Sequence, residues 1–138
     1  NDDCNAIVKQ AALLMAWSAL ERISAIKYSL KANPEQRIAM IGRDEGFLKA
    51  LGTIEKTFGQ SHPFRPIQDT RSTRSNSKKT FLFSKPADAI DYLYQIRNNI
   101  SHRGKAGYEA DMPIIVASLN ILVLTVENLL NRDDQLFN

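Results

Sequence analysis

The stretch that decides the fold is Pro113–Leu130, PIIVASLNILVLTVENLL, which is apolar on nearly every side of a helix. Its polar interruptions are Ser118, Asn120, Thr125 and Glu127, so the run falls short of a clean membrane span. A helix that is apolar all round has to be surrounded, either at the centre of a bundle or at a subunit interface. We therefore predict a helix that begins between Glu109 and Met112, ends near Asn131, and forms the centre of an all-α domain.

Two more helical segments precede this one. Residues recur at three- and four-residue steps from about Asp3 to Lys31, which predicts a first helix. Its expected core face is Ile7, Leu14, Trp17, Glu21, Ser24 and Tyr28, flanked by Leu13 and Leu20. The second segment runs from the N-cap Asn33 to about Phe58. Gly42 and Gly46 predict a break or kink inside it, because glycine disfavours a helix interior.

A further helix is predicted between Ser84 or Lys85 and about Ser101, with Gly104 and Gly107 as stop signals. No segment alternates as a β-strand does, and no internal repeat is visible. The expected architecture is all-α: one domain over residues 1–138, a bundle of four main helices with a long basic loop between the second and third.

This loop, residues 60–85, holds most of the positive charge. Its cations are Arg65, Arg71, Arg74, Lys78, Lys79 and Lys85, and its one anion is Asp69. The local balance is +5 within a chain of net charge +3, so the remainder sums to −2. Residues 61–83 show no helical period, and a loop of this length is functional or disordered. Two interpretations stay open: a binding element for an anionic partner such as RNA, or a solvated insertion.

Cys4 is the single cysteine, so the chain has no internal disulfide and no thiolate zinc cluster. This composition favours a reducing, cytoplasmic location. No signal peptide is evident, and because the sequence starts at Asn1 without Met we expect a domain excised from a larger parent protein.

Arg97 falls in the middle of an apolar helix face. Turning the helix at 84–101 by about 100° per residue places Pro86, Ile90, Leu93, Tyr94, Ile96 and Ile100 on that face. The opposite side carries Asp88, Asp91, Gln95, Asn98 and Asn99. An unpaired guanidinium on a core face is very costly, because arginine keeps its proton. Arg97 therefore needs either an internal ion pair, with Glu21 as the candidate, or a crevice that an anion enters.

The sequence Arg97-Asn98-Asn99-Ile100-Ser101-His102 extends this pattern to a histidine. It resembles the signature of the HEPN superfamily, an Arg followed by a polar residue and then, after four to six intervening residues, a His. The flanking IRNNISHRG and the WSALERI of the first helix are also similar to that family. The resemblance covers the helical framework, whereas residues 61–83 lie outside it.

HEPN domains are typically dimers, and many are metal-independent endoribonucleases whose paired Arg–His motifs meet in a cleft at the dimer interface. The resemblance implies Arg97 and His102 as catalytic residues, supported by Asn98 and Glu21, with no cofactor and no metal. It implies RNA as substrate and a homodimer, with no membrane association. Related domains serve as toxins or antiviral effectors, which would add an antitoxin or a larger parent protein as partner. The expected RNA-binding cations are Arg71, Arg74, Lys78, Lys79 and Arg103.

The chemistry suits this pair of residues. RNA carries its own nucleophile, the 2′-hydroxyl, so cleavage needs a proton-transfer group and a cation on the phosphorane. Histidine serves the first role and arginine, which forks onto phosphate oxygens, the second. Residues five apart point about 140° away from each other on a helix. Arg97 and His102 thus converge only if the helix loosens near Ser101 or if two subunits build the site.

Competing sites are few. The acidic pairs Asp88–Asp91 and Asp44–Glu45 are interpreted as solvated surface acids, and His62 as non-catalytic. Two other functions stay open. One is a non-catalytic HEPN-type module in which Arg97 holds a nucleotide or braces the bundle. The other is a helical adaptor whose apolar last helix docks a protein.

Overall fold

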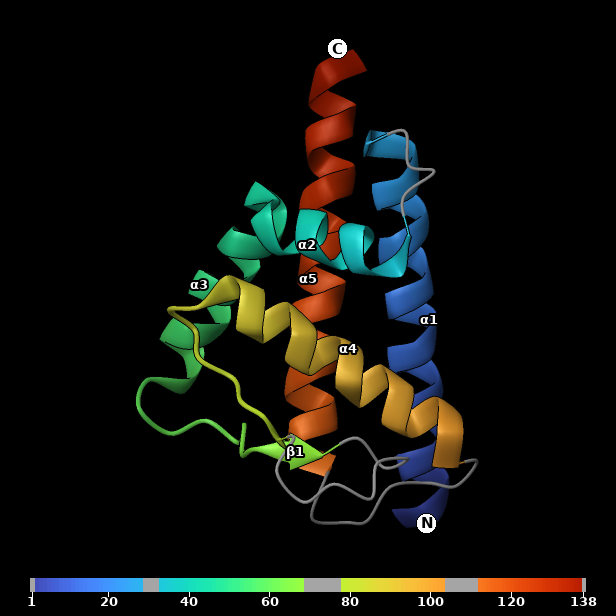
Figure 1. Cartoon of the computed structure of the whole chain (residues 1–138), viewed down its shortest axis with the longest axis vertical. Helices are drawn as coiled ribbons and strands as arrows, with labels where there is room; N and C mark the ends of the chain where they lie inside the picture. The colour runs from blue at the N-terminus through green and yellow to red at the C-terminus, as the bar shows by residue number, and fades with distance from the viewer. Residues whose placement is uncertain (1, 29–32, 69–77, 104–111, 138) are drawn as a thin grey trace.

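A computed structural model describes residues 2–28, 33–68, 78–103 and 112–137 (Figure 1). These residues form α1 (Asp2–Tyr28), α2 (Pro34–Arg43), α3 (Glu45–Phe58), α4 (Pro86–Arg103) and α5 (Met112–Phe137). Two short strands, β1 (Ile67–Gln68) and β2 (Lys78–Lys79), pair antiparallel. The all-α class is confirmed. The helix count in the described part of the chain is five, because the segment predicted as one helix at 33–58 divides into α2 and α3.

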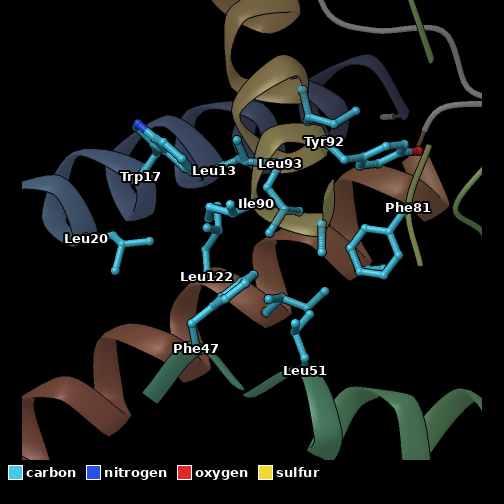
Figure 2. Packing of buried hydrophobic residues seen from close by; sticks show 14 of the residues in the cluster. Leu13, Trp17, Leu20, Phe47, Leu51, Phe81, Ile90, Tyr92, Leu93 and Leu122 are labelled. Carbon is cyan, nitrogen blue, oxygen red and sulfur yellow. The ribbon is translucent and has the colours of Figure 1, made fainter. Parts of the chain in front are cut away.

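Helix α5 lies inside the bundle, as its apolar sequence predicts. It packs against α1 and α3, and Figure 1 shows α1 and α5 running in the same direction. Buried side chains from several helices meet in one core that includes Trp17, Phe47, Leu93 and Leu122 (Figure 2). The other helices do not cover α5 on every side, however, since the apolar Val123 is 41% exposed. Within the described ranges, Met112–Asn131 is also the helix long and apolar enough to cross a membrane, a test that core helices pass too.

The break between α2 and α3 falls at Asp44, between the two glycines that predicted it. The Asp44 backbone N–H donates to Ile41 O at 3.0 Å and closes α2. The Asp44 side chain accepts from the backbone N–H of Gly46 at 2.7 Å and caps α3. One aspartate therefore ends one helix and begins the next, which is the capping chemistry that Asp favours.

Asp44 is not the solvated acid that the sequence suggested; that interpretation was wrong. The residue is 4% exposed, and its carboxylate accepts hydrogen bonds from Lys27 Nζ at 2.6 Å and from the Tyr28 hydroxyl. Burial alone raises the pKa of Asp44, but the bonds from Lys27, Tyr28 and Gly46 and the charge of Lys27 outweigh it and leave the pKa lowered. The end of α1 is thereby joined to the α2–α3 junction.

The core faces of α1 and α4 differ from the predicted ones. On α1 the buried face is centred on Leu13 and Leu20, which were expected only to flank it, while Ile7 is 56% exposed. On α4, Gln95 is buried although it was assigned to the solvent side. Tyr92 is also buried, outside the predicted face. Both differences arise because each helix is contacted from more than one direction, so one stripe does not describe its buried surface.

The described parts of residues 61–83 pack onto the bundle. Phe64 and Phe81 stack with ring centroids 3.9 Å apart, and both rings meet Tyr92 of α4 edge-on. The two-residue strands β1 and β2 lie between Phe64 and Phe81 in the sequence. The sequence had indicated no strand in this segment. Alternation over two residues is too short to register as a sequence period. The predicted basic residues Arg71 and Arg74 lie outside the described residues.

Candidate active site

The Arg–His motif lies on the last turns of α4. This helix is continuous from Pro86 to Arg103, so it does not loosen near Ser101. Regular helical geometry then keeps Arg97 and His102 about 140° apart around the axis and about 7.5 Å apart along it. The two side chains leave different sides of the helix. The convergence of Arg97 and His102 through a loosened helix is therefore not seen in this structure.

Arg97 lies half-buried on the side of α4 that faces α1. Tyr94, three residues earlier, packs edge-on against Trp17 of α1 with ring centroids 5.4 Å apart. The guanidinium Nη1 donates to Asn98 Oδ1 at 2.9 Å, so the polar residue of the motif orients the arginine. Among the described residues no carboxylate lies in hydrogen-bonding distance of Arg97, so there the other donors of the fork remain available to an anion.

The ion pair between Arg97 and Glu21 is not formed. The ion pair found among the described residues is a different one, between Lys27 and Asp44. Glu21 instead accepts a hydrogen bond from Trp17 Nε1 at 2.6 Å. The cause is helix direction: α4 ends toward the N-terminal end of α1 (Figure 1), whereas Glu21 lies one turn beyond Trp17 toward the C-terminal end of α1. Glu21 supports the core tryptophan rather than the motif arginine.

His102 is exposed, and its side of α4 is polar. Three side chains on this side make hydrogen bonds. Tyr92 Oη donates to Arg65 O at 2.7 Å, and Asn99 Nδ2 donates to Gln68 O at 2.8 Å. Gln95 Nε2 donates to Asn99 Oδ1 at 2.8 Å. Tyr92, Gln95, Asn99 and His102 follow one another at three- and four-residue steps, so they form one stripe, which we call the polar stripe.

Sequence reasoning missed Tyr92 and Asn99 as contacts of the loop, and Gln95 as a hydrogen-bond donor to Asn99. Their spacing was a usable signal, because residues at positions 92, 95, 99 and 102 share a helix side. Asn99 was instead assigned to a solvent-facing surface. Tyr92 and Asn99 donate to backbone carbonyls of a segment without periodicity. Because every residue has a backbone carbonyl, the amino-acid composition does not indicate these contacts.

The predicted RNA-binding cations are only partly described. Lys78 and Lys79 are exposed on β2, and Arg65 is exposed at the start of the same segment. Arg103 is the last residue of α4, and its side chain lies outside the described residues. The structure thus places two of the predicted cations, both on the segment that contacts the polar stripe.

His62, interpreted from the sequence as non-catalytic, makes local contacts within the loop. Its Nδ1 accepts from the Phe64 backbone N–H at 3.2 Å, and its ring meets the edge of Phe83. Within the described ranges, no group of three or more His, Cys, Asp and Glu side chains lies close enough together to hold a metal ion.

Comparisons of this chain with protein-family models, with curated proteins and with solved structures find no match.

Proposed function

We propose that this chain is a HEPN-type endoribonuclease that acts without a metal and whose catalytic groups are Arg97 and His102. The observation that supports this proposal is the state of Arg97. Its side chain is half-buried on a helix face that also carries core residues, yet its hydrogen-bond partner in the described part of the chain is the neutral amide of Asn98 rather than a carboxylate. A guanidinium kept in this way retains donors for phosphate oxygens.

The reaction needs nothing beyond the substrate and these two side chains. The 2′-hydroxyl attacks the adjacent phosphorus, and its proton passes to a base. The bond from phosphorus to the 5′-oxygen breaks, and that oxygen takes up a proton. The products are a 2′,3′-cyclic phosphate and a 5′-hydroxyl. His102 transfers the protons, and Arg97 stabilises the negative charge of the phosphorane.

A homodimer is part of the proposal. Within one chain Arg97 and His102 point to different sides of α4, so one chain alone does not surround a phosphate with both groups. A second copy related by a twofold axis would supply the missing group, as symmetric dimers commonly do. We therefore assign Arg97 and His102 of each working site to different protomers.

The mechanism is tested by the metal and sugar requirements of cleavage. We expect the protein to cut single-stranded RNA in excess EDTA and to leave a 2′,3′-cyclic phosphate or its 3′-phosphate hydrolysis product. Replacing the ribose at a mapped cut site by deoxyribose should stop cleavage there, because the attacking hydroxyl is gone. Loss of cleavage in EDTA with recovery on adding magnesium, or cutting at the deoxy position, would contradict the mechanism.

Binding and cleavage assays on the same protein distinguish the enzyme from the non-catalytic alternative. A module that binds RNA or a nucleotide through Arg97 would retain affinity and show no cleavage at any pH. An RNA that is bound but uncut by the wild type, with affinity lost in Arg97→Ala, would replace the enzymatic proposal by this binding function.

A further inference from the structure

The hairpin formed by strands β1 and β2 packs against α4, the helix that carries His102. Its register pairs Ile67 with Lys79 and Gln68 with Lys78. The carbonyl of Gln68 accepts a hydrogen bond from Asn99, and the carbonyl of Arg65, just before the hairpin, accepts one from Tyr92. Both donors belong to the polar stripe, so two side chains of α4 bind backbone carbonyls in and just before β1.

The two faces of the hairpin are unlike. Residues opposite each other in an antiparallel pair project to the same face, and successive residues to opposite faces. Ile67 is half-buried and packs against the hydrophobic core, so the face that Lys79 shares with it is turned toward the bundle. Gln68 is exposed, and Lys78 shares its face. Lys79 therefore emerges on the bundle side and Lys78 on the outer side.

The bundle side of the hairpin is also the His102 side of α4. Asn99 and His102 are three residues apart, about 60° around the helix, with side chains about 5–6 Å apart at their bases. Arg97 lies about 160° from Asn99, on the side of α1. Among the described side chains, Lys79 is therefore a cation on the His102 side of α4, whereas Arg97 faces α1.

We propose that the β1–β2 hairpin is a phosphate-binding arm for the RNA strand, with Lys79 contacting a backbone phosphate next to the one that His102 serves. Asn99 is the positioning residue that holds the arm in place. This inference rests on the proposed function, because it takes RNA as the substrate. Lysine suits the task as a compact cation on a long stem, and phosphate contacts fix the register of a strand without reading its bases.

The arm is tested by the salt dependence of binding. His102→Ala is the parent variant, so that a fluorescently labelled single-stranded RNA is bound without being cut. Adding Lys79→Ala should lower the slope of log affinity against log salt by about 0.7, the value for one phosphate contact on a single strand. Lys49→Ala removes the same charge from the exposed surface of α3 and should leave the slope nearly unchanged.

The possible outcomes test the phosphate-binding arm and the enzymatic function separately. Equal slopes for Lys79→Ala and Lys49→Ala, in a protein that cleaves RNA, would overturn the arm and leave the proposed function standing. A selective effect of Lys79→Ala in a protein that never cleaves would support the arm and overturn the enzymatic proposal. Absence of salt-dependent RNA binding in the parent would overturn the arm.

Asn99 gives an independent readout. In the otherwise wild-type chain, Asn99→Ala removes the side-chain hydrogen bond to the Gln68 carbonyl. It should raise KM several-fold while kcat stays within about twofold, because the arm binds substrate equally before and in the transition state. Asn120→Ala on the exposed side of α5 is the matched control and should change neither constant. A fall in kcat with unchanged KM for Asn99→Ala would contradict a positioning role in binding.

Discussion

Asp44 joins three helices through its backbone N–H and its carboxylate. It closes α2, caps α3, and accepts hydrogen bonds from Lys27 and Tyr28 at the end of α1. Buried carboxylates are stable in a fold only when donors or cations compensate for the lost hydration, and here both are present. The sequence places Asp44 beside Glu45 and between two glycines, a context that resembles a surface turn. Its burial depends on α1, which is distant in the chain.

Asp44→Asn should destabilise the protein by about 2 kcal/mol, because hydrogen bonds to a charged acceptor are stronger than those to an amide. Asparagine is as good an N-cap as aspartate, so the contact with Gly46 is preserved and the loss reports on Lys27 and Tyr28. Urea denaturation measures it. Asp91→Asn on the exposed side of α4 is the control, for which we expect a change within about 0.5 kcal/mol. Equal stabilities of wild type and Asp44→Asn would contradict the assigned role.

The same carboxylate should impose a dependence of stability on acid. Its pKa in the folded protein is lowered below the ordinary value of 3.8. The contribution of Asp44 is therefore fully present above about pH 4 and is lost as the pH falls through the lowered folded-state pKa. Melting temperatures of wild type and Asp44→Asn should thus converge as the pH is lowered from 6 toward 2. A gap that stays constant over this range would show that the charge of Asp44 does not contribute.

Two glycines in the helices that meet at Asp44 have opposite surroundings. A Cβ added to Gly42 of α2 would lie 2.9 Å from Ile90 Cγ2, a buried atom of α4. A Cβ added to Gly52 of α3 would meet nothing within 4 Å. The first glycine allows α2 to approach α4 closely, and the second has no such purpose in the described structure.

Gly42→Ala should therefore cost about 1 kcal/mol, because overpacking against Ile90 exceeds the gain in helix propensity. Gly52→Ala should gain about 0.5–1 kcal/mol from propensity alone. Thermal melts of the two variants, which carry the same chemical change, give the comparison. Stabilisation by both would mean that α2 and α4 are not held at contact distance.

The helical elements could be predicted from the sequence because their determinants are local. The apolar run of α5, the Asn33 cap of α2 and the spacing in α4 each lie within one segment. The core face of α1 and the burial of Gln95 could not, because they depend on which neighbours a helix meets. The hairpin was missed because its docking uses the Gln68 and Arg65 carbonyls, which every sequence possesses.

The candidate site was predicted only in part for the same reason. The position of Arg97 on a core-bearing face follows from helical periodicity, and the structure agrees. The Glu21 partner was wrong, because pairing residues on two helices requires their relative direction, which periodicity does not contain. The side of α4 that carries His102 became interpretable once Asn99 and Gln68 were placed together.

For the whole molecule, the central claim is that each RNA-cleaving site combines Arg97 of one chain with His102 of a second copy. Arg97→Ala and His102→Ala should each reduce cleavage to background as homodimers. Each should keep the fold, since Arg97 makes one neutral hydrogen bond to its neighbour and His102 is exposed. A fold check by circular dichroism accompanies both variants.

The most direct measurement mixes the two inactive variants, exchanges their subunits, and assays cleavage of single-stranded RNA in EDTA. A mixed dimer regains one complete site, with Arg97 from one protomer and His102 from the other. The account predicts activity approaching one quarter of wild type in an equimolar mixture, since half the dimers are mixed and each holds one of two sites. No recovery despite subunit exchange, or wild-type rates in either folded single variant, would contradict it.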